Sequence, residues 1–220
     1  MLSLSPQSSA PQYFSACFPT ARRCFIFDSV RVIAGQYRGR NLKNPPGMQT
    51  RPTSDRLRET LFNVLAPRVE GARFLDLCAG TGAVGIEAVS RGAAFVTFVD
   101  RVHRMCALVE SNLDLCGVPE EMTEVIKADA AEFLKRTAKG GDWRAGQGPW
   151  DIVFFDPPYA EDYAPVLHAF GEQTAHLLGE GGVLVVEHHH KNHLRDALGQ
   201  LRRWRVLKQG DSALSFYESA

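Results

Sequence analysis

The sequence predicts an α/β fold built around a largely parallel sheet. From residue 72 onward, short apolar runs typical of strands alternate with segments of helical periodicity. Such alternation places helices on both faces of a parallel sheet. The last two apolar runs are joined by the tight turn Gly210-Asp211-Ser212, which is too short for a parallel crossover. We therefore expect the sheet to end in an antiparallel hairpin.

The elements of this core follow one another in a regular order. Strands are expected at residues 73–78, 93–100, 123–129, 150–156, 181–188, 203–210 and 212–219. Helices are expected at residues 83–92, 102–117, 130–138, 163–178 and 192–201. Gly92 and Gly117 close the first two of these helices, as glycine commonly does at helix ends.

Two further elements are expected upstream of the core. "VRVIAG" and "GRNLKNP", residues 30–35 and 39–45, flank a Gly/Arg turn and predict a small hairpin. In "RPTSDRLRETLFNVLA", residues 51–66, Thr53 or Ser54 can cap a helix whose apolar residues recur at helical spacing. Its arginines Arg51, Arg56 and Arg58 are placed at the entry of that helix and away from its apolar face.

We divide the 220 residues into a leader, 1–28, and a domain, 29–220. The domain comprises a small extension, 29–70, and a catalytic core, 71–220, and it is long enough to bury a sizeable core. The leader is rich in Ser, Pro and Gln and has no acidic residue before Asp28. It is a disordered leader, a transit peptide or an extension ahead of a later start near Val30, and we favour the first of these.

Composition limits the class of protein. Apolar residues make up 45% and charged residues 23%, and no apolar run approaches the roughly 20 residues that a membrane span needs. The five cysteines form no C-x-x-C pair, which argues against a disulfide framework or a thiolate zinc site. We expect a soluble protein of a reducing compartment, the cytoplasm.

Charge is distributed unevenly along the chain. The formal net charge is zero, yet residues 22–68 contain ten Lys or Arg against three Asp or Glu, a net charge of +7. Such a basic block is either a solvated surface or a patch for a polyanion, because Lys and Arg contacts to phosphates supply most non-specific nucleic-acid affinity.

Polar or glycine-rich elements follow the first four core strands. In an open α/β sheet the ligand lies outside the carboxyl ends of the strands. The first element, Gly80 to Gly85, has the form G-x-G-x-x-G, and Asp100 follows the second strand at a distance suited to ribose hydroxyls. A dinucleotide dehydrogenase would show the same pattern. Against it, Asp76 suits a cationic amino acid moiety better than a pyrophosphate, and "DPPY", residues 156–159, has no role in hydride transfer.

These segments resemble known methyltransferases. "FLDLCAGTGAVGIEA" resembles the first motif of S-adenosylmethionine-dependent methyltransferases, whose Rossmann-like, class I sheet of seven strands ends in an antiparallel hairpin. "FFDPPY" resembles the [DNS]-P-P-[YFW] element of the amino-methyltransferases. With "VIAGQYRGRNL" and "RPTSDRLRETLFNVL" upstream, the chain from Val30 to Tyr217 resembles the bacterial family that methylates N2 of a guanine in 16S ribosomal RNA.

The resemblance implies S-adenosylmethionine as the cofactor and assigns roles to individual residues. The implied catalytic residues are Asp156, Pro157, Pro158 and Tyr159. The implied cofactor-binding residues are Asp76, Ala79, Gly80, Thr81, Gly82, Asp100, Arg101, Asp129 and Ala130. For Asp100 and Asp129, helix capping is the structural alternative. Candidates for contacts with RNA phosphates are Arg31, Arg38, Arg40, Arg51 and Arg58, although the last two are also candidates for the wall of the cofactor pocket.

The chemistry of amino-group methylation explains the "DPPY" element. A nucleobase amino group is a poor nucleophile because its lone pair is delocalised into the ring. Acceptors aimed at its hydrogens, the Asp156 carboxylate and the Pro157 carbonyl, would direct the lone pair toward the methyl carbon, and Asp156 is the candidate to take the proton. Two successive prolines restrict the backbone that carries these acceptors, and Tyr159 offers a face for a flipped-out base.

The expected partner is 16S ribosomal RNA, within the small ribosomal subunit or an assembly intermediate, bound by a monomer that does not associate with membranes. A DNA adenine-N6 methyltransferase would share the chemistry but usually carries a larger target-recognition region. A catalytically silent RNA-binding assembly factor is the other alternative. "EHHHKNH", residues 187–193, suggests a metal site by composition, but we interpret it as a polar strand-to-helix loop and expect no metal.

Overall fold

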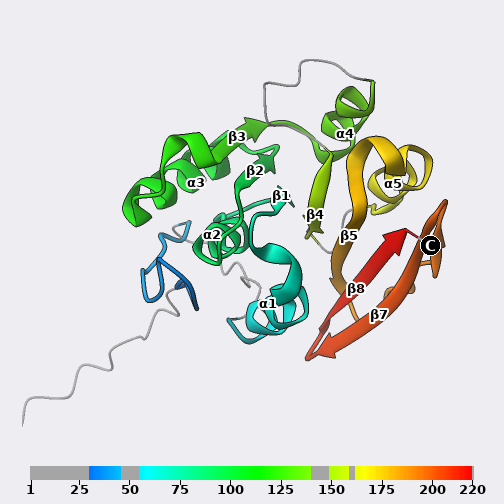
Figure 1. Cartoon of the computed structure of the whole chain (residues 1–220), viewed down its shortest axis with the longest axis horizontal. Coiled ribbons are helices and arrows are strands. Elements are labelled where there is room, and N and C mark those ends of the chain that lie inside the picture. Colours follow the sequence, from blue (N-terminus) through cyan, green and yellow to red (C-terminus); the bar gives the residue numbers. More distant parts are fainter. Residues whose placement is uncertain (1–29, 46–54, 140–148, 159–161, 220) are drawn as a thin grey trace, which may run out of the picture.

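A mixed sheet of eight strands organises the part of the chain that the structure describes (Figure 1). The structure is a computed structural model, and it describes residues 30–45, 55–139, 149–158 and 162–219. The strands are β1 Arg73–Leu77, β2 Phe95–Asp100, β3 Thr123–Lys127, β4 Trp150–Phe155, β5 Leu178–His189, β6 Ala197–Leu198, β7 Leu201–Gln209 and β8 Ser212–Ser219. Their order in the sheet is β3-β2-β1-β4-β5-β8-β7-β6.

Strand direction agrees with the sequence prediction. The pairs β3-β2, β2-β1, β1-β4 and β4-β5 are parallel, whereas β5-β8, β8-β7 and β7-β6 are antiparallel. All seven predicted strands are present, and the two-residue β6 adds an eighth at the edge. The predicted parallel core and closing antiparallel hairpin are therefore confirmed.

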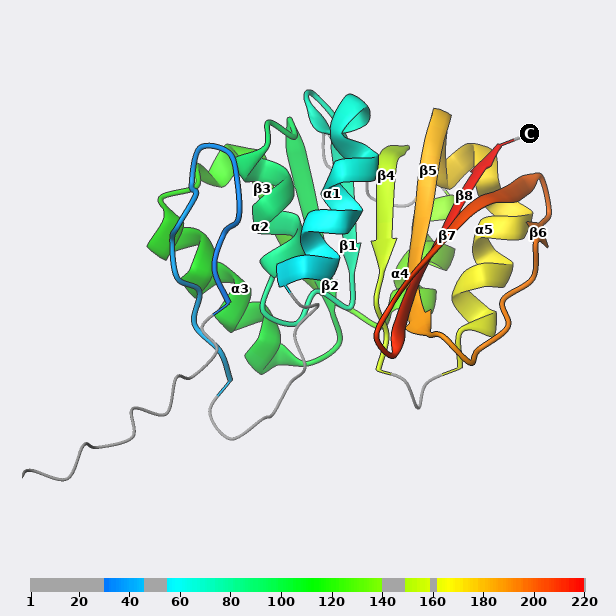
Figure 2. The same cartoon turned by 90° about the horizontal axis from the view of Figure 1, so that it is seen from below.

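Helices cover both faces of the sheet, as the views in Figures 1 and 2 show. The helices α1 Asp55–Val69, α2 Ala83–Ser90 and α3 His103–Cys116 contribute to one buried apolar cluster. The helices α4 Ala130–Ala138 and α5 Ala164–Leu177 contribute to the other. A short 3-10 helix, Glu120–Met122, precedes β3. Within the described ranges, no helix is both long and apolar enough to cross a membrane.

The central strands read as continuous apolar runs because both of their faces are buried. Along β4, Ile152 and Phe154 enter the cluster under α1 to α3. Their neighbours Val153 and Phe155 enter the cluster under α4 and α5. Every one of these four side chains is almost fully buried. Each Å² of apolar surface that is buried stabilises the fold by about 25 cal/mol. Because this strand buries apolar side chains on both faces, it contributes strongly to the stability of the core.

The N-terminal extension forms the expected hairpin. Val32 N–H donates to Arg40 O over 3.0 Å, Leu42 N–H donates to Val30 O over 2.7 Å, and Arg31 bridges Asn41 in antiparallel fashion. In both cartoon views this hairpin lies beside α2 and α3 (Figures 1 and 2). The predicted helix is α1, which continues to Val69. The predicted caps Thr53 and Ser54, and the predicted leader 1–28, lie outside the described residues.

The helix predicted at residues 192–201 is wrong. The segment forms turns and the short strand β6 instead, with Leu198 pairing with Leu201 of β7. Its backbone groups have partners in other elements: Tyr217 O–H donates to Arg195 O over 2.8 Å, and Arg203 N–H donates to Asp196 O over 2.8 Å. These tertiary hydrogen bonds override a helical pattern that is plausible in isolation.

Gly199, in the β6-β7 turn, is required by two independent constraints. Its φ of +55° is left-handed, and a Cβ there would lie 1.9 Å from Gly171 O of α5. Gly210, in the β7-β8 turn, has a similar φ of +59° but open space around it. An alanine at Gly210 would therefore meet backbone strain only, whereas an alanine at Gly199 would meet both strain and a steric clash.

We expect Gly210→Ala to cost about 1 kcal/mol of unfolding free energy, from left-handed strain alone. Gly199→Ala should cost roughly 2 to 4 kcal/mol, because α5 or the turn must also move. Denaturant unfolding of both variants beside the parent protein measures the difference. Equal losses would show that α5 does not pack against the turn as described.

Candidate active site

The carboxyl ends of β1, β2, β3 and β4 border a cavity of about 660 Å³. The cavity lies where the strand order reverses, between β1 and β4, which is the usual position of ligand sites in open α/β sheets. Its size is in the range of small-molecule and cofactor sites.

The cavity brings together most of the residues singled out in the sequence. Of the residues expected to bind the cofactor, those that line it are Asp76, Ala79, Gly80, Thr81, Asp100, Arg101, Asp129 and Ala130. Asp156, Pro157 and Pro158 line it as well. Gly82 does not line it and lies at the N-cap of α2. Tyr159 and Arg51 lie outside the described residues.

The glycine loop between β1 and α2 has an unusual backbone. Gly80 and Gly82 have φ of 56° and 77°, which glycine adopts without strain, and Cys78 adopts a φ of 65° although it is not glycine. Such strain in a non-glycine residue is concentrated at functional sites. The third glycine of the motif, Gly85, has a packing role: a Cβ there would lie 2.2 Å from the Phe98 ring of β2. The loop therefore combines close helix-sheet packing with a backbone exposed to the cavity.

Asp76 is a buried acid at the floor of this site. Its side chain is almost inaccessible to solvent, and its Oδ2 accepts a hydrogen bond from Gly85 N–H over 2.9 Å. The pKa of Asp76 is raised to about 8, chiefly by burial; the hydrogen bond from Gly85 opposes the shift and the nearby Asp100 charge adds to it. A buried carboxyl of this kind is stabilised in its ionised form by a positively charged group, so Asp76 is suited to bind a cationic group of a ligand.

Asp100 and Asp129 both cap local structure and border the cavity. Asp100 Oδ2 accepts from Gly80 N–H over 3.0 Å and its Oδ1 accepts from Val102 N–H over 2.8 Å, so it ties the glycine loop to the entry of α3. Asp129 Oδ1 accepts from Ala131 and Glu132 N–H, which makes it the N-cap of α4. The capping interpretation is thus confirmed for Asp129, and it is compatible with a place in the cavity wall.

The Asp-Pro-Pro element begins where β4 ends. Asp156 N–H donates to Leu77 O of β1 over 3.3 Å, which places the residue across the reversal point from the glycine loop. Asp156 is half-buried, Pro157 is buried and Pro158 is exposed. The element follows β4, the neighbour of β1, and therefore borders the same cavity as Asp76.

Several cavity residues were not expected from the sequence. Val102 and Met105, at the start of α3, give part of the wall an apolar surface, and Pro45 joins it from the end of the N-terminal hairpin. Glu187, near the end of β5, is a further buried acid of the wall. Glu187 could have been found by the rule that identified Asp100, since it too is an acid near a strand end. Apolar wall residues carry no such signal.

In the structure, Asp211, which is distant in sequence, lies beside the histidine-rich segment. Potential ligand atoms of His189, His190 and Asp211, the last from the β7-β8 turn, lie within 4.8 Å of one another. Both Nδ1 atoms already have backbone contacts: His190 Nδ1 lies 3.1 Å from Asp211 O, and His189 Nδ1 accepts from Lys191 N–H over 3.1 Å. The expectation that no metal binds here stays a prediction.

The predicted phosphate-contacting arginines divide into two groups. Arg31, Arg38 and Arg40 are exposed on the hairpin, whereas Arg58 is fully buried and its Nη2 donates to Arg31 O over 2.5 Å. The interpretation of Arg58 as a surface arginine is corrected accordingly. Its position three residues before Leu61 and four before Phe62 puts it on the apolar face of α1, and this spacing was readable in the sequence.

The fold and this site define a class I methyltransferase: the sheet order, the glycine loop at the order reversal and the acids beyond β1 and β2 occur together. The chain is similar over its fold to the solved structure of the Escherichia coli protein yhhF, with a TM-score of 0.74 and 30% identity over 87% of this chain and 98% of that one.

Proteins of similar sequence show to which family of methyltransferases the chain belongs. The chain is 38% identical to ribosomal RNA small subunit methyltransferase D of Escherichia coli K12, over 72% of this chain and 71% of the relative. It is 39% identical to the protein of the same name from Haemophilus influenzae, over 70% and 73% respectively. It is 35% identical to YlbH of Bacillus subtilis, over 86% and 98%. The family model described as Conserved hypothetical protein 95 matches residues 30–218. The chain belongs to this family, which the relatives identify as that of ribosomal RNA small subunit methyltransferase D.

The raised pKa of Asp76 predicts a pH-dependent stability. Between the ordinary carboxyl pKa of 3.8 and the folded-state value of about 8, the folded protein binds more protons at this site than the unfolded chain does. The stability contribution is therefore fully present below pH 3.8 and is lost as pH rises through about 8. Asp76→Asn should lack this decline, and unfolding measured from pH 5 to 9 tests it. Parallel curves for parent and variant would contradict the shift.

Proposed function

We propose that the protein transfers a methyl group from S-adenosylmethionine to the exocyclic N2 amine of a guanine in 16S ribosomal RNA. Membership in the family supports ribosomal RNA as the substrate class. The observation that carries the finer proposal is the position of Asp156 and Pro157 on the same cavity as Asp76 and the glycine loop. The proposed acceptors for an amino group and the proposed site for a methyl donor thus border one cavity.

The residues that line the cavity fit S-adenosylmethionine. The buried Asp76 suits the cationic ammonium group, and Asp100 suits ribose hydroxyls. Val102 and Met105 supply an apolar surface of the kind that a purine ring packs against. When bound, the cofactor supplies a methyl group that its sulfonium has already activated, so the protein need only orient the acceptor.

Orientation is the role that we assign to the Asp-Pro-Pro element. The Asp156 carboxylate and the Pro157 carbonyl accept the two amino hydrogens of the base, which turns the nitrogen lone pair toward the methyl carbon. Asp156 then takes the proton that the amine loses. The fixed φ of Pro157 and Pro158 keeps both acceptors in place before the base arrives. Tyr159, next in sequence, is proposed to stack on the base.

Recognition of the RNA is assigned to the hairpin. Arg31, Arg38 and Arg40 are exposed on an element of about fifteen residues, which is small for reading an extended sequence. We propose that a monomer in the cytoplasm recognises the shape of the RNA within the small subunit or its assembly intermediate. Equal activity on naked 16S RNA and on assembled particles would remove the support for this preference.

Replacement of Asp156 by Ala should lower kcat by at least about 10²-fold, because both the orienting acceptor and the proton acceptor are lost. Binding of S-adenosylhomocysteine, measured by calorimetry, should be unchanged. Asp114→Asn, on the exposed surface of α3, is the matched control and should retain full activity. An active Asp156→Ala protein would exclude the proposed role.

The substrate is tested by methyl transfer from labelled S-adenosylmethionine to small subunits lacking guanine-N2 methylation, to naked 16S RNA and to unmethylated DNA. We expect N2-methylguanosine on the subunits, identified by mass. N6-methyladenine in DNA would instead establish the adenine methyltransferase alternative. Cofactor binding without transfer to any of the three would favour a silent RNA-binding factor.

A further inference from the structure

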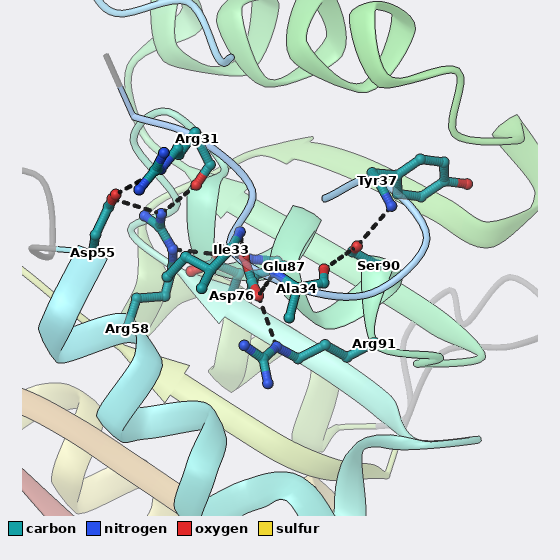
Figure 3. A network of polar contacts seen from close by, with 11 residues as sticks. Arg31, Ile33, Ala34, Tyr37, Asp55, Arg58, Asp76, Glu87, Ser90 and Arg91 are labelled. Atoms are coloured by element: carbon teal, nitrogen blue, oxygen red, sulfur yellow. Dashed lines mark hydrogen bonds and ion pairs between the residues drawn. The ribbon is translucent and has the colours of Figure 1, made fainter. Parts of the chain in front are cut away.

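The N-terminal hairpin is attached to α2 through its backbone. Ile33 N–H donates to Glu87 Oε2 over 2.7 Å, and Ala34 N–H donates to Glu87 Oε1 over 3.0 Å. Figure 3 shows the Glu87 carboxylate reaching from α2 to these two neighbouring amides. Glu87 itself is fully buried. A buried carboxylate that accepts two amide hydrogens makes strong, direction-specific contacts.

One turn later on α2, Ser90 makes a second attachment. Its Oγ accepts from Tyr37 N–H over 2.9 Å and donates to Ala34 O over 2.5 Å, as Figure 3 also shows. Its carbonyl oxygen accepts from Gln36 N–H over 2.7 Å. The approach is so close that a Cβ on Gly35 would lie 1.7 Å from Ser90 O. The tip of the hairpin therefore sits directly on the C-terminal end of α2.

Arg58 of α1 completes the attachment. Its Nη2 donates to Arg31 O of the hairpin over 2.5 Å and to Asp55 Oδ1 over 3.0 Å, while its Nε lies 3.9 Å from Glu87 Oε2 (Figure 3). Arg91 Nε donates to Glu87 Oε1 over 2.7 Å. Burial lowers the pKa of Arg58, and the charges of Asp55 and Glu87 oppose this shift.

The attachment to α2 uses backbone groups of the hairpin, and its basic side chains stay on the surface, where Arg31 also pairs with Asp55 over 3.5 Å. Arg31, Arg38 and Arg40 are all exposed. The helix that holds the hairpin is also the helix that begins at the glycine loop, and its Gly85 donates to Asp76 in the cavity. One eight-residue helix thus connects the cavity with the basic hairpin.

We propose that Glu87 and Arg58 are positioning residues for RNA binding, which hold the hairpin so that its arginines meet the RNA phosphates while the target base reaches Asp156. This inference rests on the proposed function. A desolvated ion pair is a costly way to hold a surface hairpin, since well-packed apolar residues would often be as stable. The pair does what apolar residues cannot: it binds backbone N–H and C=O groups in one register.

The test uses three variants of the full chain. Glu87→Gln keeps the shape but loses one carboxylate acceptor and the charge. Arg58→Met with Glu87→Gln removes the two fully buried charges together, so that neither is left without the other, and it leaves Arg91, whose side chain has access to solvent. Glu110→Gln, on the exposed surface of α3, is the matched control. The measurements are amide hydrogen exchange at Ile33 and Ala34, calorimetric binding of S-adenosylhomocysteine, and kcat and KM for undermethylated small subunits.

We expect faster exchange at Ile33 and Ala34 in both Glu87 variants, with exchange in the core strands and cofactor affinity unchanged. The KM for the subunits should rise about tenfold, and the dependence of log KM on log salt should become shallower by about one for each phosphate that the hairpin arginines no longer bind. The value of kcat at saturating subunits should be retained, because Asp156 and the cavity are untouched. Glu110→Gln should behave as the parent.

Two results would overturn the inference. Unchanged exchange at Ile33 and Ala34 in the double variant would show that the pair does not hold the hairpin. Faster exchange with an unchanged KM and salt dependence would show that the hairpin position does not matter for the RNA. A parent protein that neither methylates nor binds the subunits would refute the proposed function instead, and the exchange measurement would still decide whether the pair holds the hairpin.

Discussion

The reversal of strand order between β1 and β4 is the constraint on which the site depends. The chain builds β1, β2 and β3 outward with α2 and α3 on one face, and then returns through α4 on the other face to place β4 beside β1. The loops that leave β1 and β4 must therefore diverge, because the helices that follow them lie on opposite faces. The cavity occupies the space between these loops. The strands bring these acids to one edge of the sheet, and backbone N–H groups of the following loops and helices hold the carboxylates of Asp76, Asp100 and Asp129.

This arrangement has an energetic cost that falls on particular residues. Asp76 is buried with a strongly raised pKa, and Cys78 adopts a left-handed backbone that its side chain disfavours. The surrounding packing tolerates both, since Phe98 fills the space that Gly85 leaves and the flanking strands are buried on two faces. A site of this kind is preorganised: the buried carboxyl of Asp76 is in place before any ligand binds, so a complementary cationic group offsets the cost of its burial.

The hairpin shows how a small attachment can gain a fixed position without a core of its own. About fifteen residues cannot bury enough apolar surface to fold alone. Here the backbone amides of the hairpin are satisfied by Glu87 and Ser90, and Val30, Val32 and Leu42 join the apolar cluster of the main domain. The side chains of Arg31, Arg38 and Arg40 stay exposed, although Arg31 also pairs with Asp55 of α1 and Arg40 donates to Leu115 O of α3. Under the proposed function, the exposed side of this short segment would bind RNA while its other side packs against the domain.

Much of the fold was determined by local sequence. The apolar runs that became β1, β2 and β4, the capping Asp129 and the strand-end Asp100 are set by periodicity and hydrogen-bonding chemistry that act within a few residues. The row of polar strand ends then predicts one shared site, because parallel strands end at one edge of the sheet.

Tertiary structure alone decided three features. Residues 192–201 follow a helical pattern, but hydrogen bonds to β7 and β8 and the contact between Gly199 and Gly171 hold them as turns and β6. The spacing of Arg58 places it on the apolar face of α1, but its partners there, Glu87 and the Arg31 carbonyl, come from other elements and are set by the fold. Asp211 joins the histidines only because β8 returns beside β5. In each case a deciding partner lies 21 or more residues away along the chain, and local propensity does not carry information about partners that only folding brings near.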